Sequence, residues 1–135
     1  MTDVRGIHHV GIAVDDLDAA IARWTSLFGA AVEHRERVAD QGVEAASLRV
    51  GGTLIELLAA LGVDTPVGRF LDKRGPGMHH VAFECGDVGA ELARLKADGV
   101  ELIDEVPRRG MFGLQVAFVH PEATGGVLAE FVGNE

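Results

Sequence analysis

Residues that could bind a metal recur at corresponding places in the two halves of this 135-residue chain. Each half has a histidine near the start of a short alternating segment and, much later, a glutamate within an apolar run. An ionised carboxylate in such a run is costly unless it is paired or bound to a metal. Two imidazoles and two carboxylates suit Zn²⁺, Mn²⁺, Co²⁺, Ni²⁺ or Fe²⁺ and do not discriminate among them. We therefore expect one divalent ion, with ligands at His9, Glu56, His80 and Glu130.

Two similar segments carry the histidines, because residues 7–14 and 78–85 both contain a double histidine followed by alternating residues. Side chains alternate between the two faces of a strand. His9 should therefore lie on the same strand face as Gly11. His80 should likewise lie on a strand face that carries small residues. The small side chains would leave room for a ligand, while the larger apolar residues of the opposite face pack under helices.

The elements that must position these ligands follow the same duplication. Each half starts with a strand, continues with a helix that Asp16 or Asp87 can cap, and ends with three strands. The expected strands are residues 7–14, 30–37, 43–50 and 53–58 in the first half, and 79–85, 100–103, 114–119 and 127–132 in the second. The expected helices are 17–28 and 88–97, with a short one near 67–72.

Each half is thus a βαβββ module, and we expect one α+β domain over residues 1–135. Module one covers about 6–60, a connection covers 61–77, and module two covers about 78–135. A four-stranded sheet with one helix leaves one face uncovered. Two modules side by side would form a curved mixed sheet around a metal-containing cavity, with the helices on the convex face.

The composition excludes several classes of protein. A net charge of −9 and the absence of tyrosine argue against a general nucleic-acid binder. The chain has no apolar run near the roughly 20 residues that a membrane span requires. Its single cysteine, Cys85, excludes an intrachain disulfide framework. We expect a cytoplasmic protein that binds neither nucleic acid nor membranes.

Several motifs together resemble a known family. The resemblance covers nearly the whole chain and identifies it as a member of the vicinal oxygen chelate superfamily, close to the methylmalonyl-CoA epimerases. The motifs are IHHVGIAV at 7–14, DQGV at 40–43, IELL at 55–58, GMHHVAFE at 77–84, PRRG at 107–110, FVHP at 118–121 and GGVLAE at 125–130.

The resemblance implies a glyoxalase-like fold of paired βαβββ modules and the same four metal ligands. It also implies a homodimer that interconverts the two C2 epimers of methylmalonyl-CoA with one divalent metal ion. Many such epimerases carry a glutamate, taken as a base, at the position of Ala45. The base is therefore open here, and the candidates are Glu130, Glu84 and Glu44, although alternation puts Glu44 on the opposite strand face.

Four basic residues in the two long loops are candidates to bind the CoA phosphates: Lys73, Arg74, Arg108 and Arg109. Solvated loop charges are the alternative interpretation of these residues.

Two other functions remain open at this point. The first is another metalloenzyme on the same scaffold, a lactoylglutathione lyase-type isomerase or a dioxygenase. The second, ranked lower, is a non-catalytic ligand-binding protein, which would be expected to have an aromatic-lined cavity. One Trp and no Tyr argue against such a cavity.

Overall fold

The computed structural model describes residues 2–134, and these belong to two compact units. The first unit comprises residues 9–79. The second comprises the chain before His9 together with the chain from His80 onward. Among the described residues, no helix has the length and apolar character needed to cross a membrane. The single domain expected from the sequence over residues 1–135 stays a prediction.

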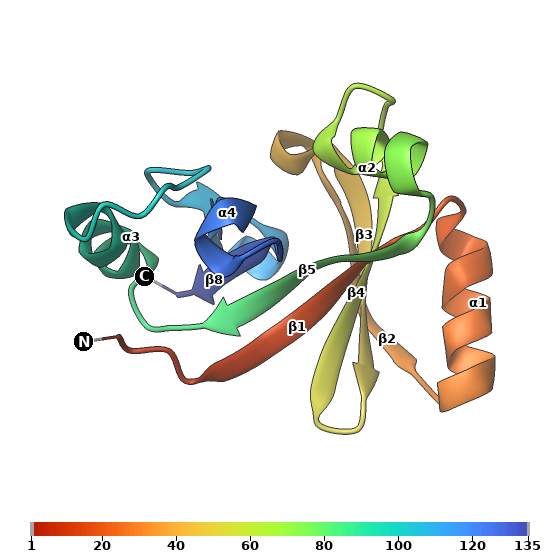
Figure 1. The fold of residues 1–135 in the computed structure, drawn as a ribbon. Helices are drawn as coiled ribbons and strands as arrows, with labels where there is room; N and C mark the ends of the chain where they lie inside the picture. The colour runs from red at the N-terminus through yellow and green to blue at the C-terminus, as the bar shows by residue number, and fades with distance from the viewer. Residues whose placement is uncertain (1, 135) are drawn as a thin grey trace. The chain divides into compact units, whose positions relative to one another are not determined.

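The first unit has the predicted order of strand, helix and three strands (Figure 1). Its strands lie in the order β2-β3-β4-β1, with β1 parallel to β4 and the other pairs antiparallel. A helical segment, α2, follows the last strand. The elements are β1 (Gly6–Ala13, most of which belongs to this unit), α1 (Leu17–Phe28), β2 (Ala31–Val38), a 3-10 turn (Ala39–Gln41), β3 (Val43–Val50), β4 (Thr53–Ala60) and α2 (Pro66–Arg74).

Local sequence signals determine where α1 begins and ends. The Asp16 carboxylate accepts a hydrogen bond from the Ala19 N–H at 3.0 Å, which satisfies one of the open donors at the helix start. Gly29 ends the helix in the left-handed conformation, at φ 67°, which glycine adopts without steric cost. The apolar side of α1 then packs against Leu48 of β3 and Leu57 of β4 to form the core of this unit.

The second unit repeats the order, with strands β5-β8-β7-β6 and β5 parallel to β8. Its helix α3 is capped by Asp87 and packs Val88 and Leu92 against β7 and β8. Cys85 is buried in this core, where burial raises the pKa of its thiol to about 11. The elements are β5 (Gly77–Glu84), α3 (Val88–Ala97), β6 (Arg108–Arg109), a 3-10 turn (Met111–Gly113), β7 (Gln115–Val119), α4 (Pro121–Thr124) and β8 (Ala129–Gly133).

The strand expected at 100–103 is the main error of the secondary-structure prediction. Only Leu102 pairs there, through an isolated bridge to Val119. The Phe118 N–H, which a continued strand would need as a partner, donates instead to the Asp104 carboxylate at 2.9 Å. The strand that pairs with this edge of β7 is β6, which is not among the strands expected from the sequence. The helix in the connection is also longer than expected, because Thr65 caps it and Pro66 occupies its first turn.

Candidate active site

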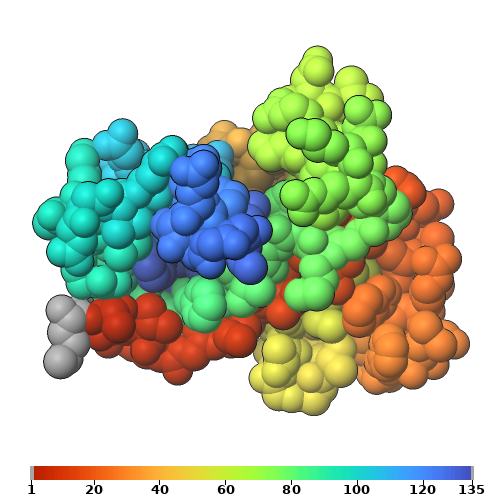
Figure 2. All heavy atoms as spheres, in the orientation of Figure 1, coloured from red at the N-terminus to blue at the C-terminus, as the bar shows by residue number. Residues whose placement is uncertain are grey.

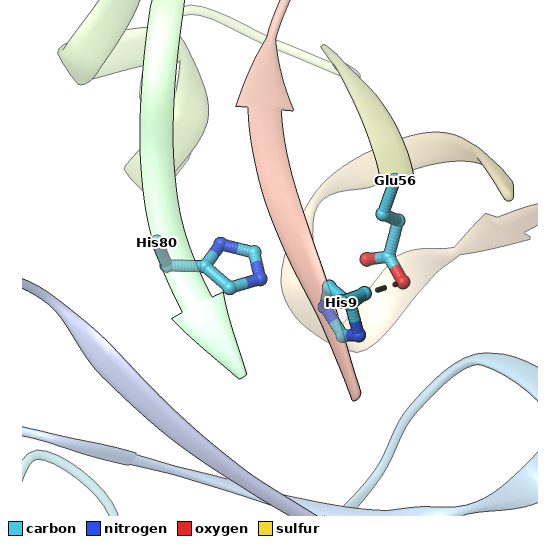
Figure 3. Close-up of side chains that lie close together, drawn as sticks. All are labelled: His9, Glu56 and His80. Carbon is cyan, nitrogen blue, oxygen red and sulfur yellow. Dashed lines mark ion pairs between the residues drawn. The ribbon is translucent and has the colours of Figure 1, made fainter. Parts of the chain in front are cut away.

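A buried histidine and a glutamate meet in the first unit. His9 on β1 is 4% exposed, and its Nε2 lies 3.5 Å from Oε2 of Glu56 on β4. Figure 3 shows the Glu56 carboxylate turned toward the His9 ring. The two side chains share a face because Gly11, two residues after His9, is the register partner of Glu56. The structure thus brings these two expected ligands together.

The second unit contains the equivalent pair. His80 on β5 and Glu130 on β8 are both almost completely buried, and His80 Nε2 lies 3.3 Å from Glu130 Oε1. Ala82, two residues after His80, is the register partner of Glu130. The ring of Phe118 meets the His80 ring edge-on, with 5.3 Å between their centroids. This aromatic contact restricts the orientation of the imidazole.

The donor atoms of these pairs fit a divalent metal ion. His9 and Glu56 belong to a group of His and Glu side chains that could hold one. Imidazole nitrogens and carboxylate oxygens together suit the borderline divalent ions of the first transition row. A carboxylate as deeply buried as that of Glu130 is costly without a charged or hydrogen-bonding partner, and a cation would offset this cost.

The face of the first unit that carries Glu56 extends across two more strands. Ser47 on β3 is the register partner of Glu56, and His34 on β2 is the register partner of Ser47. One row along, Glu36 on β2 lies opposite Ala45 on β3. The imidazole of His34 and the carboxylate of Glu36 are 2.8 Å apart and partly buried.

Neither His34 nor Glu36 is among the candidate site residues expected from the sequence. The alternation of charged residues along β2 could have shown that both side chains share one face. Their relation to Glu56 depends on the pairing register of three strands, which no local pattern predicts.

The three candidate bases lie in different surroundings. Glu130 is in the buried pair described above. Glu84, at the end of β5, shares the strand face of His80 but is exposed. Glu44 lies on the face of β3 opposite Ala45, where it accepts a hydrogen bond from Arg35 at 3.1 Å. Hydrogen bonds to Asp18 and Glu44 raise the pKa of Arg35, so this guanidinium stays charged.

The four basic candidates lie on regular elements rather than in loops. Lys73 and Arg74 form the last turn of α2, whose green surface is visible in Figure 2. The Arg74 guanidinium lies over the Phe70 ring, 5.7 Å from its centroid. Arg108 and Arg109 form β6, and Arg108 Nε is 3.2 Å from the Asp104 carboxylate. Lys73, Arg74 and Arg109 are exposed and Arg108 is partly buried.

Comparisons with known proteins agree with this architecture. Residues 8–118 match the model of the glyoxalase/bleomycin resistance protein/dioxygenase superfamily. An ethylmalonyl-CoA/methylmalonyl-CoA epimerase of Cereibacter sphaeroides is 37% identical over 92% of this chain and 94% of its own length. The crystal structure of methylmalonyl-CoA epimerase from Mycobacterium tuberculosis is 41% identical, with a TM-score of 0.95, over 100% of this chain and 91% of that one.

A third similar protein has been solved with a ligand. It is a Streptomyces coelicolor methylmalonyl-CoA epimerase in complex with 2-nitronate-propionyl-CoA, 37% identical, with a TM-score of 0.93 over 97% of this chain and 95% of that one. The expected α+β fold of the glyoxalase type is confirmed by these similarities. The chain belongs to the glyoxalase/bleomycin resistance protein/dioxygenase superfamily and, within it, to the methylmalonyl-CoA epimerase family.

Proposed function

We propose that this protein is a metal-dependent epimerase that interconverts the (2R) and (2S) forms of methylmalonyl-CoA. The observation that carries the proposal is the repeated buried pair, His9 with Glu56 and His80 with Glu130. Relatives that cover most of this chain are named for the same reaction, which supports the choice of substrate.

His9, Glu56, His80 and Glu130 would together hold one divalent ion. When bound, the ion supplies Lewis-acid stabilisation of negative charge on the substrate oxygens. The chain's own contribution is to exclude water, since His9, His80 and Glu130 are each at most 4% exposed. Charge stabilisation is stronger in such surroundings than in water.

The reaction needs proton transfer on both faces of C2. The C2 hydrogen lies between a thioester carbonyl and a carboxylate, so its removal leaves an enolate. A base on one face and an acid on the other then invert the centre. Among the residues expected from the sequence, Glu130 and Glu84 share a face with His80 by strand alternation and are the candidates for one of these roles.

The CoA phosphates need cations at the edge of the site. We assign Lys73 and Arg74 on α2 and Arg108 and Arg109 on β6 to this contact. The planar guanidinium of arginine binds phosphate with two donors, which lysine cannot do. The position of Lys73 and Arg74 at the end of α2 also favours that helix without any ligand, because cations there complement its dipole.

Isotope exchange tests this function directly. Purified protein with Co²⁺, incubated with (2S)-methylmalonyl-CoA in D₂O, should give the (2R) epimer and incorporate deuterium at C2. EDTA followed by gel filtration should abolish both signals, and added Co²⁺ should restore them. Fully metal-loaded protein that produces neither epimer nor deuterated substrate would disprove the assignment.

A further inference from the structure

We propose that Glu36, held by His34, is a proton-transfer residue at C2 of the substrate, on the side of the site formed by β2 and β3. This inference rests on the proposed epimerase function. It assigns a base in a chain whose β3 carries no carboxylate on the face of Glu56, where its three central residues are Ala45, Ser47 and Arg49.

The strand register places Glu36 on the same face as the metal-ligand candidate Glu56. Ser47 is paired with Glu56 across β3 and β4, and Ala45 is paired with Glu36 across β2 and β3. Residues opposite each other in antiparallel strands point to the same side of the sheet. Glu36 and Glu56 are two strands and two residues apart, which corresponds to about 12 Å between their backbones.

The strand between them carries small side chains on this face. Ala45 and Ser47 are its smallest residues there, and each is only 1% exposed, so β3 itself adds little bulk between the two carboxylates. On β2, Glu36 is the register partner of Ala45, so its side chain leaves the sheet on this same face. The methylmalonyl group, with its oxygens toward Glu56, would then bring C2 toward Glu36.

Glu36 contacts a group that suits proton transfer better than the groups that Glu33 and Glu44 contact. Glu33 and Glu44 are bonded to the guanidinium groups of Arg49 and Arg35. The hydrogen bond from Arg49 lowers the pKa of Glu33, which makes that carboxylate a weaker base. Glu36 contacts the imidazole of His34 at 2.8 Å, and an imidazole can both donate and accept a proton.

The proposed step is balanced without any co-reactant. The C2–H bond breaks, its electron pair enters the enolate, and the proton forms the carboxylic acid of Glu36. A proton delivered to C2 from the other face gives the opposite epimer. Glu36 then loses its proton to solvent through His34, which is half-exposed. In the reverse direction the protonated Glu36 acts as the acid.

The experiment compares Glu36→Gln with Glu33→Gln, a charge-matched change on the same strand. Glu36→Gln should reduce epimerisation by about 10²–10⁴-fold, the usual contribution of a general base. It should leave the metal content and KM within a factor of two to three, and Glu33→Gln should behave like the wild type. Deuterium uptake from D₂O should persist for the epimer whose proton faces the remaining base, because that base still acts alone.

Each other outcome is informative. Full epimerisation by Glu36→Gln, or loss of deuterium uptake from both epimers at unchanged metal content, would overturn the assignment of Glu36. A wild-type protein without epimerisation would instead remove the proposed function, so the two failures are distinguishable. His34→Gln should reduce kcat less than Glu36→Gln and shift the pH dependence of kcat, since it removes the proton exit and not the base. A pH profile identical to that of the wild type would exclude this role of His34.

Discussion

The two units present the same buried His–Glu pair on sheet faces with different neighbouring side chains. In the first unit, the register row through Glu56 contains Gly11, Ser47 and His34. In the second unit, the corresponding row through Glu130 contains Ala82 and Phe118. The small serine is thus replaced by an aromatic ring, which contacts His80.

The next row differs in charge. The first unit has Ala13, Leu58, Ala45 and, on its outer strand, Glu36. The second unit has Glu84, Val132, Val116 and, on its outer strand, Arg108. An acidic residue in one unit thus corresponds to a basic residue in the other.

Residues with a role in both modules are therefore the same in the two units, whereas residues with a role in only one module differ. In the proposed function, the repeated His and Glu residues of each unit bind the metal. Proton transfer and anion binding need opposite chemistry, and we place them in the first and second units through Glu36 and Arg108.

Loss of either repeated histidine should have the largest effect, and the two effects should be alike. His9→Ala and His80→Ala should each remove the bound metal and lower kcat/KM by more than about a thousandfold, because an ion with one ligand missing no longer stabilises the enolate. His8→Ala, next to His9 on the other strand face, is the control and should retain metal. Elemental analysis measures the metal content, and epimerisation assays measure kcat/KM. Full metal retention by His80→Ala would contradict the assignment of His80 as a ligand.

The row that contains Phe118 should contribute more to the free energy of unfolding than the row that contains Ser47. Phe118→Ala removes the ring contact with His80 and should lower the free energy of unfolding by about 2–3 kcal/mol, somewhat below the loss for a fully buried phenylalanine. Ser47→Ala in the corresponding row should cost about 1 kcal/mol or less. Urea unfolding of the two variants measures the difference. Equal losses would show that the two rows are packed alike.

The sequence predicted the elements that depend on local signals and the residues that depend on duplication. Aspartate caps predicted where α1 and α3 begin, and alternation predicted the strands that carry His9 and His80. The pairing of Phe118 with Asp104 was not predictable, since the contact joins residues 14 apart through one side-chain hydrogen bond. For the same reason, the sequence could not place Glu36 opposite Ala45. Register is set by the whole sheet and not by a segment.

The charge contrast between Glu36 and Arg108 predicts different kinetic effects. Arg108→Gln should raise KM for methylmalonyl-CoA about tenfold and change kcat by less than a factor of three, because a phosphate contact far from C2 stabilises ground state and transition state alike. Arg23→Gln, an exposed change on α1, should leave both constants unaltered. Steady-state kinetics at several salt concentrations provide the test. A loss in kcat with unchanged KM would instead place Arg108 near the reacting atoms.

The smallest expected effect comes from a difference between the two helices. The α1 position that corresponds to Glu91 of α3 is occupied by the buried Ala20. Burial raises the pKa of Glu91, but hydrogen bonds from the Asp3 N–H, the Thr2 hydroxyl and Arg94 outweigh it, so the pKa lies below 4.5. A carboxylate with a lowered pKa stabilises the fold above its unfolded pKa, and this contribution is lost as the pH falls through the folded value.

Glu91→Gln should therefore lower the free energy of unfolding by about 1–2 kcal/mol at pH 7, since hydrogen bonds to a charged group are the strongest of their kind. The difference from the wild type should shrink as the pH drops below 4.5, the ordinary value for this carboxyl. Glu105→Gln, which removes an exposed pair with Lys96, should leave the stability nearly unchanged, because solvent screens that pair. Thermal unfolding at pH 7 and near pH 3.5 distinguishes the two. A difference for Glu91→Gln that grows toward acid would mean that Glu91 is protonated in the fold, and that the chain start is held to α3 by another contact.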